Sequence, residues 1–183
     1  MDTQEIISKT EALHHAHFIE FHLQDKCTKF SVCGAIRRKD DLISEIDIVC
    51  SPDYAVKRDF SLFDSKMDVT TNPVKEWVHR EMHSDSIELM AASDKLFCFK
   101  FHGVPVTIYM VDEQNYGLAQ AIHTASNSYF KRMEKSWISL GYELKGLALV
   151  HKKSGLPPHP FPTEKAFFNW LNWTYKKPEL REN

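Results

Sequence analysis

The sequence predicts an α+β fold, with a small mixed sheet flanked by helices, followed by a smaller and mainly helical unit. Three observations predict this fold. Short apolar runs of strand length lie between residues 29 and 111, and helical spacing of apolar residues marks both the N-terminal segment and the chain after residue 122. We place the boundary between the units near residues 120–124, so that they span residues 1–121 and 122–183. With 183 residues, 43% of them hydrophobic, the chain is large enough to bury a core.

The N-terminal unit is expected to begin with an amphipathic helix over residues 3–24. Its apolar residues recur at helical spacing: Ile6, Ile7, Leu13, Phe18, Ile19 and Leu23. A strand in KFSVCGAI then enters a turn at Gly34. The apolar run ISEIDIVCS follows and indicates a strand that is buried on both faces.

The second half of this unit predicts a helix and a hairpin. Asn72 before Pro73 is typical of a helix start, because asparagine caps free N–H groups and proline suits the first turn. We expect this helix to continue to Met82. KLFCFKF and VPVTIYMV have the composition of strands, and the His102-Gly103 pair between them predicts a hairpin turn.

The C-terminal unit is expected to contain two helices around one short strand. SNSYFKRMEKSWISLGY has helical spacing and ends at Gly141, YELKGLALV indicates a strand, and Thr163 is expected to cap a last helix. The large apolar residues of this last helix indicate core packing. Base stacking by aromatic residues beside lysines is the alternative for Trp170, Trp173 and Tyr175.

Charge is distributed unevenly, although the formal net charge is only −2. Residues 122–183 hold ten Lys and Arg against five Asp and Glu, whereas residues 1–121 hold 13 against 20. This excess favours a polyanion bound by the C-terminal unit, and a chance distribution of solvated charges explains it equally well. No apolar run reaches the ~18 residues of a membrane span, so we expect no membrane partner.

Other residue patterns exclude some sites. The four cysteines show no CxxC spacing, and the N-terminal residues show no signal peptide, so we expect reduced thiols in a cytoplasmic protein. No serine or cysteine lies in a nucleophile motif, which disfavours hydrolases. His79 and His83 are four residues apart in HREMH, but without a third ligand they indicate an exposed helix rather than a zinc site.

The segment CGAIRRKDDLISEIDIVC carries the clearest chemistry. Glu45 and Asp47 lie two residues apart in a predicted strand, so they share a face and repel, unless a divalent cation lies between them or one is protonated. Gly34 permits close backbone approach of a ligand, and Arg37 and Arg38 are donors for phosphate. Together these residues favour a metal-bound nucleoside triphosphate. The alternative is an exposed sheet face on which the arginines pair with the acids.

This segment resembles the palm signature of family X DNA polymerases, the group that includes polymerase beta, in which G-S-x-R-R precedes D-x-D. VTIYMVDEQNYGLAQAIHTASNSYFKRMEKSWISLGYELKG is similar to the family's last palm strand and the start of its thumb, and FPTEKAFFNWLNWTYKKPELREN to its closing helix. The resemblance runs from about residue 30 to the end and is weak between residues 52 and 95. It implies a nucleotidyltransferase palm in residues 1–121 and a small, mainly helical thumb in residues 122–183.

The family's metal-binding positions are only partly kept. By the resemblance, Asp47 is the second acid of D-x-D, Glu45 replaces the first, and Thr107 stands where the family has its third aspartate. A threonine cannot take the place of a carboxylate as a metal ligand or as a general base. The resemblance therefore implies Glu45 and Asp47 as the catalytic and metal-binding residues, with Mg²⁺ or Mn²⁺ if the protein is active.

Positions that face the nucleotide and the DNA in the family also differ. Ala35 replaces the serine of G-S-x-R-R, the motif Y-F-T-G-S reads IHTAS over residues 122–126, and Asn127 and Phe130 replace an aspartate and an asparagine. The residues that the resemblance implies at the nucleotide are Gly34, Arg37, Arg38, Thr124 and Asn127. Those it implies on DNA lie on the polar side of the first thumb helix: Lys131, Arg132 and Lys135.

Two functions stay open at this point. One is a polymerase X-like protein that binds a Mg-nucleotide, DNA or both, with reduced or altered nucleotidyl transfer. The alternative is a catalytically inactive palm–thumb module that binds DNA or a protein partner. Sugar and base preference, template dependence and oligomeric state do not follow from the sequence.

Overall fold

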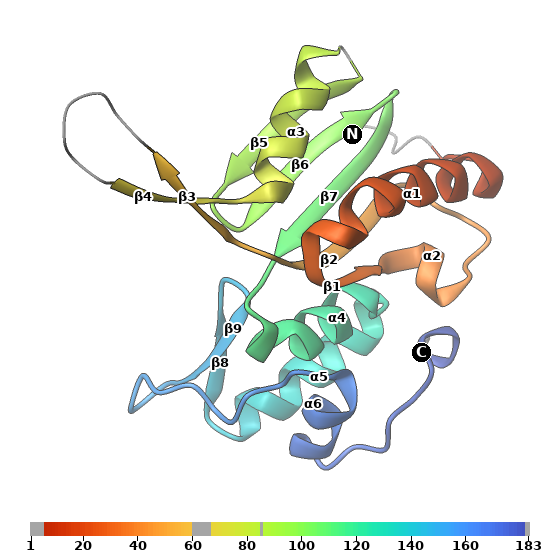
Figure 1. Ribbon diagram of the computed structural model, residues 1–183. Helices are drawn as coiled ribbons and strands as arrows, with labels where there is room; N and C mark the ends of the chain where they lie inside the picture. The colour runs from red at the N-terminus through yellow and green to blue at the C-terminus, as the bar shows by residue number, and fades with distance from the viewer. Residues whose placement is uncertain (1–5, 60–66, 85, 182–183) are drawn as a thin grey trace.

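The computed structural model describes residues 6–59, 67–84 and 86–181. The chain forms two lobes, with a sheet and its helices in the upper lobe and helices with a hairpin in the lower lobe (Figure 1). In these two lobes the predicted α+β class, with a mixed sheet flanked by helices, is confirmed.

The upper lobe is built on a five-stranded sheet in the order β1-β2-β7-β6-β5. Strands β2 and β7 are parallel, and all other neighbours are antiparallel. The strands are β1 (Cys27–Val32), β2 (Ile46–Pro52), β5 (Ile87–Ser93), β6 (Leu96–Phe101) and β7 (Val104–Met110). A separate ribbon of β3 (Ala55–Asp59) and β4 (Met67–Thr71) connects β2 to the next helix.

Helices α1 (Lys9–Leu23) and α3 (Pro73–His83) cover one face of this sheet (Figure 1). Alternate strand residues point toward these helices and are buried, as period-two alternation requires. They include Phe97, Phe99, Phe101, Val106 and Ile108. Burial of this apolar surface is the main stabilising term for the lobe.

The opposite face of the sheet carries the polar residues. Asp47 and Thr107 lie opposite each other in β2 and β7, and they alternate with Ile46, Ile48, Val106 and Ile108, which point toward the helices. Beyond them, α4 (Tyr116–Thr124) packs against Cys33, Val49 and Val111, and the short helix α2 (Gly34–Arg38) follows β1. The space between α2, α4 and the sheet is where a site can form.

The lower lobe contains α5 (Asn127–Ser139), the hairpin β8 (Tyr142–Lys145) and β9 (Ala148–His151), and α6 (Glu164–Trp170). Its core is aromatic and includes Tyr129, Trp137, Phe161, Phe167 and Phe168. Three short 3-10 turns complete the chain: η1 (Gln24–Lys26), η2 (Glu113–Asn115) and η3 (Pro178–Leu180).

Helix α4 belongs to both lobes. Its residues Tyr116 and Ala119 pack toward the sheet, whereas Leu118 and Ala121 belong to the core of the lower lobe. Gly117 lies against the backbone of Thr163, where a Cβ atom has no room. The boundary predicted between residues 121 and 122 therefore falls inside a helix that joins the lobes.

Two local predictions were wrong. The first helix begins at Lys9 rather than residue 3, because Ser8 Oγ accepts a hydrogen bond from Glu11 N and Ile7 pairs with Ile43; residues 1–5 of that prediction lie outside the described residues. YELKGLALV forms a hairpin rather than one strand, since Gly146 turns the chain with φ 59°.

Other local predictions were confirmed. Asn72 Oδ1 accepts hydrogen bonds from two N–H groups of α3, and Thr163 caps α6. Positive φ angles at His102 and Gly103 form the turn between β6 and β7. Within the described ranges, no helix is long and apolar enough to span a bilayer.

Candidate functional site

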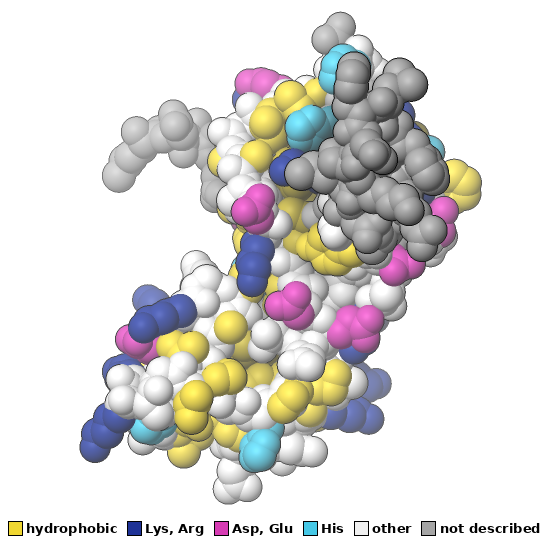
Figure 2. Space-filling view, turned by 60° about the vertical axis from the view of Figure 1, so that its left-hand side comes forward, with side chains coloured by type: hydrophobic (Ala, Val, Ile, Leu, Met, Phe, Trp, Pro, Cys, Tyr) yellow, Lys and Arg dark blue, Asp and Glu magenta, His cyan; other side chains and the backbone are white. Residues whose placement is uncertain are grey.

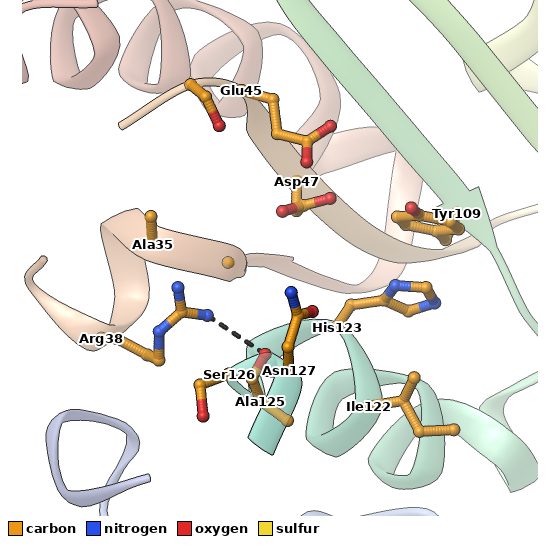
Figure 3. A pocket seen from close by; sticks show the side chains of 12 residues that line it. Ala35, Arg38, Glu45, Asp47, Tyr109, Ile122, His123, Ala125, Ser126 and Asn127 are labelled. Carbon is orange, nitrogen blue, oxygen red and sulfur yellow. Dashed lines mark hydrogen bonds between the residues drawn. The ribbon is translucent and has the colours of Figure 1, made fainter. Parts of the chain in front are cut away.

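A pocket of about 440 Å³ lies between the two lobes. It is lined by the start of α2, the segment that enters β2, the end of β7 and the α4–α5 junction (Figure 3). The lining residues are Gly34, Ala35, Arg38, Ser44, Glu45, Asp47, Tyr109, Ile122, His123, Ala125, Ser126 and Asn127. The predicted residues Gly34, Arg38, Glu45, Asp47 and Asn127 are thus brought together in one cavity.

Glu45 and Asp47 are the acidic residues of this pocket. Glu45 comes directly before β2 rather than in it, and both side chains project into the same space (Figure 3). Burial, and then the charge of Glu45, raise the pKa of Asp47 to about 7. Two carboxylates this poorly neutralised favour a bound cation.

The carboxylate set is small. Among the described residues, no group of three His, Cys, Asp or Glu side chains is placed to hold a metal ion. Asp47 lies opposite Thr107, whose hydroxyl is directed to Cys98 Sγ at 3.8 Å. Two acids still fit Mg²⁺, because this ion often binds one or two carboxylates and takes its other ligands from phosphate and water.

Gly34 places α2 directly against Asp47. Its φ angle of 60° is in the left-handed region, and a Cβ atom at this position would overlap Asp47 Oδ2. Cys33 N also donates to Asp47 O at 2.7 Å. The glycine is therefore required both by the backbone conformation and by the position of the acid.

Arg38 lines the pocket but is already held on two sides. Its Nε and Nη2 donate to Asp40 Oδ2, and its Nη1 donates to Thr124 O. The same Nη1 also donates to Ala125 O (Figure 3). A guanidinium has five N–H donors, so one remains for a ligand. Arg38 therefore lines the pocket with one donor not used within the protein.

Arg37 lies outside the pocket. Its Nη1 and Nη2 donate to both carboxylate oxygens of Glu164 at 2.8 Å, and its Nη1 donates to Thr124 Oγ1. Thr124 is fully buried, and it does not line the pocket either. The sequence prediction placed both residues at the nucleotide; the structure uses them to join the lobes.

Arg181 completes this buried network. Its guanidinium is fully buried, donates to both oxygens of Glu164, and lies over the rings of Phe168 and Tyr175. Burial would raise the pKa of Glu164, but hydrogen bonds from Arg37 and Arg181 outweigh it and lower that pKa. Sequence reasoning missed Glu164 and Arg181, which have no local motif.

A stacked pair of rings forms one wall of the pocket. The Tyr109 and His123 centroids are 3.5 Å apart with an angle of 20° between the planes. Burial lowers the pKa of His123 to about 4, so the imidazole is neutral near pH 7. Its Nε2 is buried and has no hydrogen-bond partner among the described residues. Sequence reasoning gave His123 no role.

The predicted DNA-binding residues lie on the exposed side of α5. Lys131, Arg132 and Lys135 are all exposed, and no described carboxylate forms an ion pair with any of them. Dark-blue side chains are more frequent than magenta ones on the lower lobe in Figure 2. The three residues therefore form part of a positively charged surface.

The sequence also singled out a histidine pair, the cysteines and Trp170, and no binding site follows from their positions. His79 and His83 are exposed on α3, where His83 Nδ1 lies 2.6 Å from His79 O. All four cysteines are free. The ring of Trp170 packs against Tyr142 and Phe161.

Comparisons with known proteins identify the fold. No protein-family model matches the chain, and no curated protein matches it. Among solved structures, the chain is similar to polymerase beta of Leishmania infantum, crystallised as a ternary P/T complex, with a TM-score of 0.71 and 19% identity. The similarity covers 98% of this chain and 77% of that one. It shows a polymerase beta-like nucleotidyltransferase fold.

Proposed function

We propose that the pocket binds a nucleoside triphosphate together with Mg²⁺ or Mn²⁺, and that nucleotidyl transfer is reduced or altered. The observation that carries this proposal is that Glu45, Asp47 and Arg38 line one polar pocket. The P/T complex of the similar polymerase supports a nucleotide and DNA as ligands of this fold. Four free cysteines fit a cytoplasmic protein.

Each pocket residue has a role in this proposal. Glu45 and Asp47 would hold the cation, which would neutralise triphosphate charge and polarise a phosphoryl oxygen. The free N–H of Arg38 donates to a phosphate oxygen, and Gly34 lets the phosphates approach the backbone. The amide of Asn127 points into the pocket, where it can contact the sugar or base (Figure 3). Duplex DNA phosphates would lie along Lys131, Arg132 and Lys135.

Binding of a dNTP measured by calorimetry tests the site. We expect binding by the native chain with Mg²⁺ or Mn²⁺, and its loss in Asp47→Asn, which keeps the shape but removes the charge. Asp112→Asn is the matched control, because Asp112 is exposed and outside the pocket. Equal binding in EDTA, or no binding by the native chain, contradicts the proposal.

A catalytically inactive module that binds DNA or a protein is the second candidate. Thr107 opposite Asp47 and the engagement of Arg37 by Glu164 favour it. Primer extension by the native chain, Thr107→Asp and the matched Thr107→Asn variant separates the two functions. Extension by the native chain favours the first function. Extension only in Thr107→Asp favours the second function, and it shows that one missing acid at position 107 accounts for the lack of activity.

A further inference from the structure

We propose a second binding site, on the lower lobe, that takes an unpaired strand of nucleic acid. The site consists of two adjoining hollows that share Trp173 and Thr174. One, of about 270 Å³, is lined by Tyr129, Arg132, Trp173, Thr174 and Lys176. The other, of about 510 Å³, is lined by Asn169, Asn172, Trp173, Thr174 and Tyr175. Neither set includes a residue of the pocket between the lobes, so the inference does not depend on nucleotide binding there; Arg132 is shared with the α5 surface proposed for duplex DNA.

The end of α6 places Trp173 between the hollows. Asn172 has a φ angle of 57°, and asparagine adopts this left-handed conformation more easily than most residues. Asn172 N donates to Asn169 O, and Trp173 N donates to Phe168 O at 2.9 Å. This turn ends the helix and directs the next side chain across the surface of the lobe.

The ring of Trp173 is supported from behind. It lies edge-to-face with Tyr129 at 5.7 Å between centroids, and its centroid is 6.5 Å from that of Phe168, with 31° between the ring planes. The residue is only partly buried, and no described residue accepts a hydrogen bond from its indole N–H. A fixed ring with a free donor suits a base that stacks beside a phosphate.

The charged side chains that line the hollows around Trp173 are all positive. Arg132 and Lys176 line the smaller hollow, and no Asp or Glu lines either hollow. The guanidinium of Arg132 lies over the Tyr129 ring at 4.9 Å, and no described carboxylate pairs with it or with Lys176. These cations are therefore free for phosphate contacts.

These features together fit single-stranded nucleic acid better than a duplex. An aromatic face stacks on bases only when the bases are unpaired, and the carboxamides of Asn169 and Asn172 can contact base edges in the larger hollow. A duplex offers phosphates but no base faces. The chemistry is shared by DNA and RNA strands.

Fluorescence anisotropy of a labelled 12-residue dT oligonucleotide, in EDTA, tests the site. We expect Trp173→Leu, which keeps apolar contact with Tyr129 and Phe168, to weaken binding at least about fivefold, and Trp173→Phe to restore most of it. Lys176→Ala should reduce the magnitude of the slope of log K against log salt by about 0.7. Lys153→Ala, the same change outside both hollows, should leave affinity unchanged.

Three results overturn the proposal. They are equal affinity for the strand and its duplex, equal loss in Lys153→Ala and Lys176→Ala, and no effect of Trp173→Leu when circular dichroism shows that the variant is folded. Each means that charge alone binds the polyanion. An rU oligonucleotide in parallel shows which sugar the site prefers, and acidic polyglutamate should not compete.

Discussion

Two groups of charges at the junction of the lobes are built in opposite ways. Around Glu164, two arginines surround one carboxylate, every oxygen of which accepts hydrogen bonds, and Glu164 and Arg181 are buried. Around Asp47, two carboxylates share a pocket with Arg38, which is mostly engaged by Asp40 and by backbone carbonyls. In the first group the carboxylate is fully paired within the protein, whereas in the second the two carboxylates are not.

This difference separates charges that are paired within the protein from charges that remain available in a pocket. A buried ion pair with all its hydrogen bonds made holds the helices that carry it in one arrangement. The folded protein loses stability when one partner is removed. An acid such as Asp47, whose pKa is raised by burial and by a neighbouring carboxylate, is stabilised in its charged form when a cation binds beside it. The adjacent arginines Arg37 and Arg38 illustrate the point, because the first lies in the structural group and the second lines the pocket.

The largest effect is expected from Glu164→Gln. It leaves the buried guanidinium of Arg181 without its anion, so we expect the free energy of unfolding to fall by about 3–5 kcal/mol in urea denaturation. Glu179→Gln is the matched control, because Glu179 forms an exposed pair with Lys39 at 3.8 Å. Its effect should stay below about 1 kcal/mol. Equal effects would mean that the network does not join the lobes.

The next effect concerns the contact between Gly34 and Asp47. Gly34→Ala should cost about 1–2 kcal/mol for the left-handed backbone, and the overlap with Asp47 should add to this and abolish nucleotide binding. Gly103→Ala has the same kind of backbone strain, with φ 86°, but its Cβ meets no atom within 4 Å. The difference between the variants in chemical denaturation and calorimetry isolates the contact. Equal losses in both would show that only the backbone matters.

The sequence predicted the charges of the pocket better than those of the Glu164 network. Gly34, Arg38, Glu45 and Asp47 lie within 14 residues, so their chemistry could be read as one motif. The network of Arg37, Glu164 and Arg181 joins residues up to 144 positions apart, and no local spacing indicates it. Consequently Arg37 was assigned to phosphate, although its partner lies in the last helix.

The fold shows the same division. Elements with a local cap or turn signal were predicted, such as α3 at Asn72 and the turn at Gly103. Strand β5 was missed because most of its residues are exposed on an edge, which leaves little apolar alternation. Helix α4 was missed because it is buried on both sides, against the sheet and the lower lobe, and so lacks a polar face.

A smaller effect is expected from His123, which depends on pH. Burial lowers its pKa to about 4, below the ~6.5 of an unfolded histidine. The unfolded chain therefore binds more protons between these values, so stability is lost as pH falls from 6.5 toward 4. We expect the difference in unfolding free energy between native and His123→Phe chains to change by about 2 kcal/mol from pH 7 to pH 5. A constant difference would mean that this imidazole is solvated.

The smallest effect on stability is expected at the unpaired cations of α5. Lys131 is exposed and has no carboxylate partner among the described residues, so Lys131→Ala should change the free energy of unfolding by less than about 0.5 kcal/mol. The affinity of this variant for duplex DNA should nevertheless fall. The magnitude of the slope of log K against log salt should decrease by about 0.9, because one phosphate contact is lost. Lys152→Ala removes the same charge at the end of β9 and should change neither quantity. If both variants bind equally weakly, the lower lobe attracts DNA through its net charge, and α5 is not the surface that contacts it.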